Sequence, residues 1–249
     1  MTTVDEHYQR LLAKHYTWMF NTSFAQKVEE QKSILSPALK PVIGKPTPSL
    51  AVDLGSGPGF QTIALAQLGF APVVAVDTSA ELLGELRSHA GDLPIQIRHA
   101  DLRDLPGIVA PGEAAAIVCM GDTLTHLPGK TDVRALFAAV SSCLAPGGIF
   151  VITYRDLTVE LKGTERFILV RNDENTIMTC FLEYEDPEYV TVHDLVHTRE
   201  SKSWILCKSS YRKLRLGAGW LIQELLASGF VIQSQGPSGR LFQIVAGKP

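Results

Sequence analysis

Three aspartates stand at the ends of short apolar runs, where their carboxylates could bind one ligand together. Asp53 lies two residues before a glycine turn, Asp77 closes the next run, and Asp101 follows a third. The turn, Gly55–Gly59, lets the backbone bend tightly and approach a ligand without a Cβ collision. The helix after it would direct free N–H groups at a ligand above the strand. In nucleotide-binding α/β folds an acid placed like Asp77 accepts hydrogen bonds from ribose hydroxyls, so the pattern favours a ligand that contains a nucleoside.

The spacing of the glycines argues against a dinucleotide. It is G-x-G-x-G, and Phe60 stands where a dinucleotide-binding turn has glycine or alanine. A pyrophosphate would gain nothing from the nearby Asp53 carboxylate, whereas a cationic amino-acid headgroup would be attracted to it. These residues therefore predict an adenosyl amino acid as the ligand.

Two of the acids have a structural alternative that the sequence leaves open. Asp77 could cap the helix that begins at Thr78, and Asp101 could cap a turn leading into Arg103. Asp53 has no such alternative, because a carboxylate that closes a buried strand needs bonding partners. The functional interpretation is therefore favoured for Asp53.

The elements that must position these acids alternate between strand and helix from Ser49 onward. Short, nearly continuous apolar runs predict buried strands, and helical spacing predicts helices between them. The predicted strands are Leu50–Leu54, Pro72–Val76, Ile95–His99, Ala114–Met120 and Ile149–Tyr154, and the predicted helices are Gln61–Leu68, Ala80–His89 and Asp132–Leu144. This alternation is typical of an α/β fold with a mostly parallel sheet covered on both faces.

Further segments surround these elements. Residues 1–45 have apolar and aromatic side chains at helical spacing, which predicts a helical cap ending near Pro37 and Pro41, before a linker at Pro46 and Pro48. In residues 156–216 the apolar residues no longer alternate between strand and helix spacing, because no helix separates the strands. This segment predicts an antiparallel insertion with strands at Phe167–Val170, Thr176–Glu185, Tyr189–Thr198 and Trp204–Leu216. A helix at Trp220–Ala227 and a closing hairpin around Gly236–Gly239 complete the core. We therefore expect one domain, with a Rossmann-like, doubly wound core of seven strands in residues 49–155 and 217–249.

The charge and composition of the chain limit the partners and the cellular compartment that we expect. The formal charge is −3, and only Arg212, Lys213 and Arg215 cluster, on what we interpret as a solvated strand face. No nucleic-acid partner is therefore expected. The four cysteines lack zinc-site and disulfide spacing, and we interpret His193 and His197 as a solvated pair, so no metal is predicted. Because neither a signal peptide nor a membrane-spanning stretch is recognisable, a cytoplasmic protein is expected.

The ordered motifs resemble the class I S-adenosylmethionine-dependent methyltransferases, over roughly Tyr16 to Ser234. Asp53-Leu54-Gly55-Ser56-Gly57-Pro58-Gly59 is similar to that family's first motif, which implies that it holds the methionine end of the cofactor. The resemblance further implies that Asp77, with Thr78 beside it, holds the ribose, and that Asp101 and Leu102 hold the adenine. It places Met120-Gly121-Asp122 near the reacting methyl, and it covers Leu144–Gly148 before the fifth strand.

The segments Met120–Leu127 and Tyr154–Asp156 resemble a glycine N-methyltransferase-like group of small-molecule enzymes. This resemblance implies a small-molecule N or O acceptor and direct in-line transfer, which needs positioning more than a dedicated catalytic residue. We expect the acceptor pocket to include Tyr16 from the cap, where Thr17 replaces the acid of related enzymes, His126 as a candidate base and Arg155 as a carboxylate clamp. Each of these could instead be structural, and for His126 the structural role is the more common one.

Two other functions stay open from the sequence. One is an NAD-dependent oxidoreductase, which Phe60 and the glycine spacing oppose. The other is a non-catalytic protein that binds S-adenosylmethionine or its product S-adenosylhomocysteine. The inserted strands would serve as a substrate lid or as the surface of a homodimer. Glycine itself is not implied as the acceptor.

Overall fold

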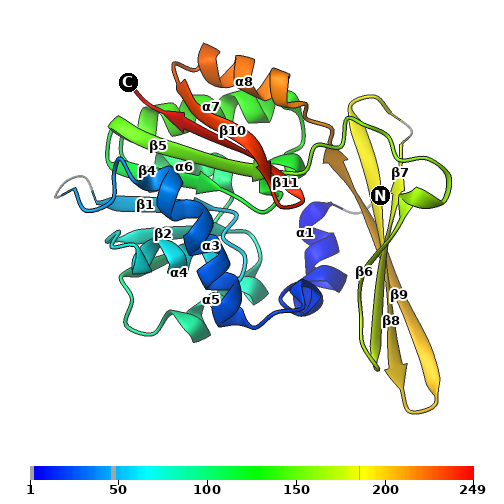
Figure 1. Cartoon of the computed structure of the whole chain (residues 1–249). Helices are drawn as coiled ribbons and strands as arrows, with labels where there is room; N and C mark the ends of the chain where they lie inside the picture. Colours follow the sequence, from blue (N-terminus) through cyan, green and yellow to red (C-terminus); the bar gives the residue numbers. More distant parts are fainter. Residues whose placement is uncertain (1–2, 46–48, 185) are drawn as a thin grey trace.

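The computed structural model describes residues 3–45, 49–184 and 186–249, and a seven-stranded sheet forms its centre (Figure 1). Its strands are β1 (Leu50–Leu54), β2 (Val73–Asp77), β3 (Ile95–His99), β4 (Ala114–Cys119), β5 (Leu144–Tyr154), β10 (Val231–Ser238) and β11 (Leu241–Gly247). Their order is β10-β11-β5-β4-β1-β2-β3, and β11 runs antiparallel to both of its neighbours while the other pairs are parallel. The mostly parallel seven-stranded sheet predicted from the sequence is confirmed.

The register of the parallel strands brings the candidate acids to one edge of this sheet. Asp53 pairs with Ala75 of β2 and with Val118 of β4, and Asp77 pairs with His99 at the end of β3. From β1 the sheet grows in two directions: β2 and β3 follow on one side, and β4 and β5 follow on the other. In open α/β sheets ligands bind at such a point, outside the carboxyl ends of the strands.

Helices cover both faces of the sheet, because neighbouring strand residues point to opposite sides and both sides are apolar. Ala51 packs into one buried cluster and Val52 into the other. One layer contains α3 (Phe24–Leu39), α4 (Phe60–Gln67) and α5 (Ala80–Ala90), and the other contains α6 (Leu105–Ile108), α7 (Lys130–Cys143) and α8 (Ala218–Ala227).

The N-terminal segment consists of short helical pieces that precede α3. They are α1 (Val4–His7), a π-helical turn at Tyr8–Leu12, α2 (Ala13–Tyr16) and a 3-10 turn at Trp18–Phe20. The prediction that a helix ends near Pro37 is wrong, since Pro37 lies inside α3, which continues to Leu39. The helix continues because Leu35 and Leu39 are both fully buried, which outweighs the hydrogen bond lost at the proline.

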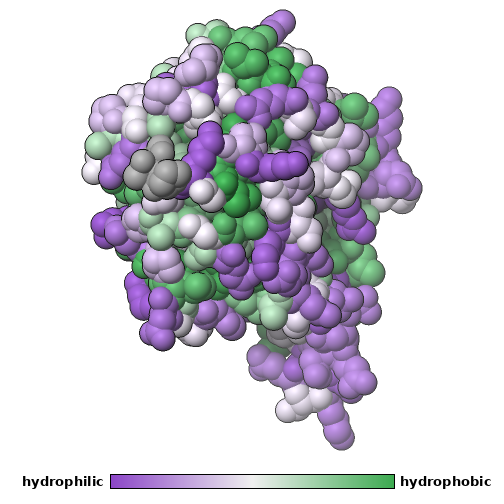
Figure 2. Space-filling model, turned by 60° about the vertical axis from the view of Figure 1, so that its left-hand side comes forward, coloured by the Kyte–Doolittle hydropathy of each residue, from purple (hydrophilic) through white to green (hydrophobic). Residues whose placement is uncertain are grey.

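Residues 156–216 contain a second, four-stranded antiparallel sheet, as the change of period predicted. Its strands, in spatial order, are β6 (Phe167–Asn172), β7 (Thr176–Glu183), β8 (Tyr189–Glu200) and β9 (Ser203–Leu214). The predicted linker at Pro46 and Pro48 and the predicted strand end at Glu185 lie outside the described residues. The inserted sheet projects from the core, and the tip of its β8–β9 hairpin is hydrophilic (Figures 1 and 2).

The N-terminal segment lies between the core and the inserted sheet (Figure 1). Leu11 and Leu12 pack against Met178 of β7 and Val196 of β8. Within the described part of the chain, no helix is long and apolar enough to cross a membrane.

The interpretation of Arg212, Lys213 and Arg215 as one solvated face is wrong for two of the three. Arg212 is exposed, but the Lys213 and Arg215 side chains are only 12 % and 7 % exposed. Arg215 donates to the carbonyls of Leu157 and Asp186, and Lys213 pairs with a carboxylate. The strand alternates its faces, so that Arg212 points outward while Lys213 and Arg215 point toward the body of the protein.

Candidate functional site

The glycine turn after β1 has a left-handed backbone at Gly55, Gly57 and Gly59, with φ of 73°, 52° and 95°. A Cβ on Gly55 would lie 2.3 Å from Thr123 Cγ2, and a Cβ on Gly59 would lie 2.1 Å from Leu86 Cδ1. A Cβ on Gly57 would meet nothing closer than 3.7 Å. Two of the glycines are therefore required by neighbouring side chains, whereas Gly57 leaves room for a ligand.

Asp77 is held against this turn by the backbone. Its Oδ2 accepts a hydrogen bond from the Gly57 N–H and its Oδ1 accepts one from the Ser79 N–H, both at 2.7 Å. Burial raises the pKa of Asp77, although these hydrogen bonds oppose the rise. A carboxylate has about four lone-pair sites, so two accepted bonds leave about two sites for hydroxyl donors. Ser79, and not Asp77, caps α5 through its side chain.

Asp53 lies at the same edge as Asp77 but deeper, with 1 % of its surface exposed. Its Oδ2 accepts a hydrogen bond of 2.6 Å from Thr62 Oγ1, which supplies the partner that a buried carboxylate needs. Burial raises the pKa of Asp53 to about 7, and the negative Asp77 adds to the rise. Asp53 does not line the pocket above the turn, so direct contact with a cofactor stays a prediction, and its hydrogen bond links the end of β1 to α4.

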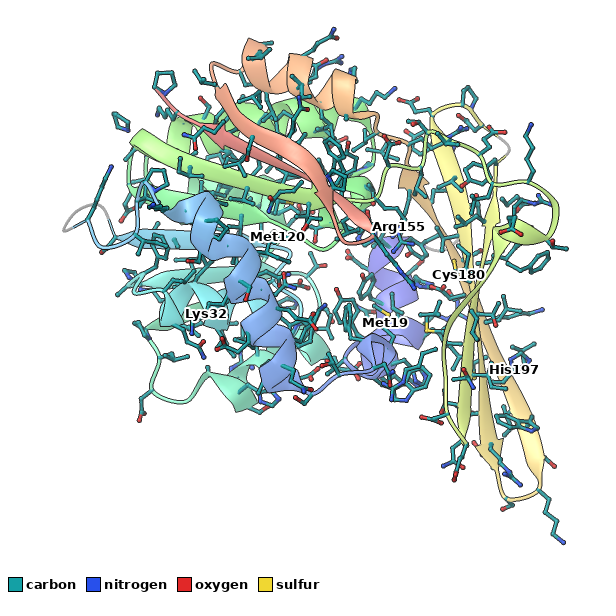
Figure 3. All side chains as sticks on the ribbon, in the orientation of Figure 1. Met19, Lys32, Met120, Arg155, Cys180 and His197 are labelled. Carbon is teal, nitrogen blue, oxygen red and sulfur yellow. The ribbon has the colours of Figure 1, made fainter. Side chains whose placement is uncertain are left out.

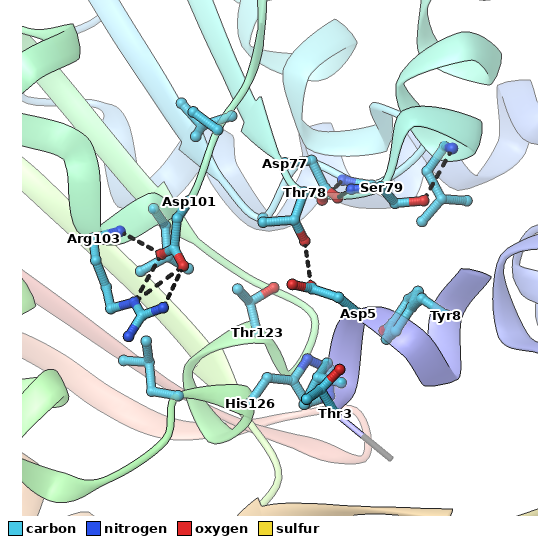
Figure 4. Close-up of a pocket in the computed structure, with 18 of the residues that line it drawn as sticks. Thr3, Asp5, Tyr8, Asp77, Thr78, Ser79, Asp101, Arg103, Thr123 and His126 are labelled. Atoms are coloured by element: carbon cyan, nitrogen blue, oxygen red, sulfur yellow. Dashed lines mark hydrogen bonds and ion pairs between the residues drawn. The ribbon is translucent and has the colours of Figure 1, made fainter. Parts of the chain in front are cut away.

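A pocket of about 310 Å³ opens above the glycine turn (Figure 4). This volume is at the lower end of the range, roughly 300 to 1,000 Å³, found for small-molecule sites. The sheet edge contributes Gly55, Gly57, Asp77, Thr78, Asp101, Leu102, Thr123 and His126 to its lining, and the N-terminal segment contributes Thr3, Val4, Asp5, Tyr8 and Tyr16. The two sides are joined by a hydrogen bond of 2.8 Å from Thr78 Oγ1 to Asp5 Oδ1.

Asp101 lines this pocket and also caps the turn that follows it. Its carboxylate accepts hydrogen bonds from the Arg103 N–H and from the Arg103 guanidinium, at 2.6 to 3.0 Å. The Arg103 side chain lowers the pKa of Asp101. The capping alternative is therefore present in the fold, and the adenine contact that the resemblance implies stays a prediction for Asp101 and Leu102.

The loop after β4 lies behind the pocket wall. Gly121 N–H donates to Thr153 Oγ1 at 2.9 Å, and Asp122 accepts from Lys213 Nζ at 2.5 Å. Burial raises the pKa of Asp122, but the Lys213 ammonium and other partners outweigh this and hold the pKa below its usual value. Met120, Gly121 and Asp122 are not among the residues that line the pocket, nor are Ser56 and Gly59.

The structure places only two of the three residues predicted for the acceptor pocket in the pocket lining. Tyr16 and His126 line the pocket, whereas Arg155 is exposed and lies outside its lining. Figure 3 places Arg155 between the core and the inserted sheet, on the side of Met19 and Cys180. The Arg155 backbone N–H donates to Asp122 Oδ1 at 3.0 Å. His193 Nε2 lies 2.7 Å from Glu183 Oε2. Among the described residues, no group of three or more side chains could hold a metal ion.

Among the residues of this site that sequence reasoning missed are Asp5 and Tyr8, which line the pocket, and Lys213, which lies behind its wall. Asp5 and Tyr8 belong to a segment whose spacing showed helices but not which surface they cover. Lys213 is separated from its partner Asp122 by 91 residues. No local pattern signals such a contact, because only the packing of the inserted sheet creates it.

The residues present fit an adenosyl amino acid. Gly57 is open toward the pocket, and Asp77 keeps acceptor sites for ribose hydroxyls at the lip of the turn. Ser56 Oγ and His126 Nε2 are buried without a hydrogen-bond partner among the described residues. Arg103 in the pocket lining pairs with Asp101, and Asp5 and Asp77 have no cation beside them in the lining, which suits a cationic ligand better than a pyrophosphate.

Comparisons with known proteins point in the same direction. Residues 51–148 match the family model described as a methyltransferase domain. The chain is 32 % identical over 111 residues to a glycine/sarcosine N-methyltransferase of Halorhodospira halochloris, a match that covers 42 % of this chain and 39 % of that relative. It is also 32 % identical over 99 residues to a ubiquinone biosynthesis O-methyltransferase of Methylococcus capsulatus, covering 39 % and 40 % of the two chains. The chain thus spans less than half the length of these curated relatives.

A solved structure shares nearly the whole fold. It is an S-adenosylmethionine-dependent methyltransferase from Clostridium acetobutylicum, with a TM-score of 0.73 and 16 % identity over 98 % of this chain and 96 % of that one. Residues 51–148 thus match the model of a methyltransferase domain, and the chain has the fold of the S-adenosylmethionine-dependent methyltransferases. The comparisons lend no support to the oxidoreductase alternative.

Proposed function

We propose that the protein is an S-adenosylmethionine-dependent methyltransferase that methylates a nitrogen or oxygen of a small molecule. The observation that carries the proposal is the pocket at the carboxyl ends of β1, β2 and β3, where an open glycine turn adjoins Asp77. The matched methyltransferase domain covers this same edge. S-adenosylmethionine would supply a methyl group made electrophilic by its sulfonium, so that the protein has to bind, orient and exclude water.

Each side of the pocket has a proposed part in that task. Gly57 would allow close approach of the methionine end, Asp77 with Thr78 would hold the ribose, and Asp101 with Leu102 would border the adenine. Asp53 would support the turn through its hydrogen bond with Thr62. The N-terminal segment would close the pocket and keep water out, because Asp5 and Tyr8 cover the edge of the sheet.

The acceptor would bind beside Tyr16 and His126. One curated relative is named an N-methyltransferase and another an O-methyltransferase, which supports either atom as the nucleophile. Burial raises the pKa of Tyr16 and lowers that of His126 to about 3, so both side chains would be uncharged at neutral pH. They would orient the acceptor by hydrogen bonds rather than remove its proton in a separate step. Arg155 could clamp a carboxylate only if the acceptor extends beyond the pocket lining.

Calorimetry and turnover test the proposal. We expect S-adenosylmethionine and S-adenosylhomocysteine to bind with one site per chain, and NAD not to bind. Incubation with a metabolite pool should then release S-adenosylhomocysteine. Binding of NAD without a response to the methyl donor would overturn the proposal, and binding of the methyl donor without turnover in any pool would indicate a non-catalytic binding protein.

We also propose that the protein forms a homodimer through its inserted sheet and works in the cytoplasm without nucleic-acid partners. Large apolar side chains are exposed on the two outer strands, β6 and β9: Phe167, Leu169, Trp204, Ile205 and Leu206. Exposed apolar surface of this kind favours association. Light scattering should give twice the mass of the 27.2 kDa chain, and Phe167→Lys with Trp204→Lys should give the mass of one chain.

A further inference from the structure

Lys213 extends from β9 of the inserted sheet to the loop after β4 of the core. Its Nζ lies 2.5 Å from Asp122 Oδ2, and the two side chains are only 12 % and 14 % exposed. Two charges removed from water require a close partner, so this pair strongly fixes its own geometry. The inserted sheet therefore makes a specific ionic contact with the catalytic edge of the core.

Asp122 connects Lys213 to the pocket wall through further hydrogen bonds. Its carboxylate also accepts hydrogen bonds of 3.0 Å from Thr125 Oγ1 and from the Arg155 N–H. Thr125 belongs to the 3-10 turn η4 (Thr123–His126), which begins directly after Asp122. At one end of η4, Thr123 packs against Gly55, and at the other end His126 lines the pocket.

We propose that Lys213 is a positioning residue of the methyl-transfer site, which acts by fixing Asp122 and thereby η4, so that Thr123 and His126 are held at the pocket wall. The inference rests on the proposed function for its chemical meaning, but its structural part can be tested without any methyl transfer. It assigns to the inserted sheet a part in building the site, beyond that of a lid or a dimer surface.

The pair also contributes to the electrostatic surroundings of His126. The charged and titratable groups that face this ring are Asp122 on its own loop, Lys213 and Tyr211 from β9, and His7 and Tyr8 from the N-terminal segment. Burial is the main cause that lowers the pKa of His126 to about 3; Lys213 contributes to the lowering, and Asp122 opposes it. A neutral ring leaves this wall without a positive charge that would repel a cationic methyl donor.

Removal of the lysine alone should release η4 and change the surroundings of the His126 ring. In Lys213→Met the buried Asp122 carboxylate loses its cation, so burial should raise its pKa and its side chain is no longer fixed by an ion pair. In Lys213→Met with Asp122→Asn the uncharged amide oxygen can still accept the hydrogen bonds from Thr125 Oγ1 and the Arg155 N–H, so η4 should keep its place. Lys208→Met, an exposed position on the same strand, is the matched control.

Nuclear magnetic resonance of histidine-labelled protein measures this directly, with His126→Gln to assign the signal. We expect the His126 ring signals to shift in Lys213→Met at neutral pH, and to stay close to their wild-type positions in the double variant and in Lys208→Met. Wild-type ring signals in Lys213→Met would overturn the proposal.

Calorimetry with S-adenosylhomocysteine and turnover complete the test. For a wild-type protein that turns over, we expect methyl transfer to fall about tenfold to a hundredfold in Lys213→Met, through misplacement of η4, and to be unchanged in Lys208→Met. Equal turnover of Lys213→Met and wild type would contradict a positioning role. If the wild type binds neither the donor nor its product, the proposed function fails, while the magnetic resonance result still decides whether Lys213 positions η4.

Discussion

Gly55, Gly57 and Gly59 share a left-handed backbone but require glycine for different reasons. Side chains lie directly against Gly55 and Gly59, while a Cβ on Gly57 would make only ordinary contacts, with Tyr16 and Leu82. The motif could be recognised from the sequence because its spacing is local. Which glycine faces the ligand could not, because that depends on Thr123 and Leu86, which arrive from other parts of the chain.

Alanine substitutions should separate these roles. We expect Gly59→Ala to lower the free energy of unfolding by roughly 2 to 4 kcal/mol, because it combines a left-handed alanine with a collision in the core. Gly57→Ala should cost only about 1 to 2 kcal/mol, since the strain remains but the collision is absent. Urea denaturation measures both, and equal losses would contradict the absence of a collision at Gly57.

Asp53 should make stability depend on pH. Its pKa in the folded protein is about 7, above the ordinary value of 3.8, so the folded state binds the proton more tightly than the unfolded chain. This contribution is fully present below about pH 4 and is lost as the pH rises through about 7.

Asp53→Asn should remove that dependence. Between pH 5 and pH 8 the wild type should lose roughly 2 to 3 kcal/mol that the variant does not lose, as measured by urea denaturation at each pH. The exposed Asp92→Asn is the matched control and should follow the wild type. Parallel curves for Asp53→Asn and wild type would show that the buried carboxyl is not the group responsible.

At the level of elements, the strands and most helices could be predicted, because each has its own apolar run or helical spacing. The exception is α3, where Pro37 was expected to end the helix and the burial of Leu35 and Leu39 continues it. The N-terminal segment was recognised as helical, but its place over the pocket depends on contacts such as Thr78 with Asp5, which lie 73 residues apart.

This segment should control how long a bound cofactor stays. Thr78→Val removes the hydrogen bond to Asp5, which is worth about 0.5 to 1.5 kcal/mol, so the dissociation rate of S-adenosylhomocysteine should rise about two- to tenfold. Stopped-flow fluorescence would measure it, with the exposed Thr164→Val as the control. An unchanged dissociation rate would show that the segment does not retain the ligand.

At the level of the whole molecule, Arg215 ties together the loops at the base of the insertion, next to the core. Its guanidinium donates to the carbonyls of Leu157, Thr158 and Asp186, at 2.8 to 3.1 Å, where the chain leaves β5 and where it turns before β8. Composition alone suggested a solvated basic cluster, because the sequence does not show which face of β9 meets the body of the protein.

Two neighbouring arginines should therefore behave differently. Arg215→Met should lower the free energy of unfolding by roughly 2 to 4 kcal/mol, because several carbonyls lose a charged donor. Arg212→Met should cost less than about 1 kcal/mol, since its ion pair with Asp186 is exposed. Thermal and urea denaturation would measure both, and similar losses would restore the solvated-face interpretation.

The same architecture implies that the N-terminal segment can fold into place only after the inserted sheet has been synthesised. The N-terminal segment is synthesised before the strands on which it packs: His7 bonds with Asp194, a residue made 187 positions later, and its ring lies against Tyr211. Until β8 and β9 have been synthesised, the apolar side of this segment has no surface to pack on. Leu11 and Leu12 therefore stay uncovered until these strands have been made, which makes this segment a natural point for chaperone contact.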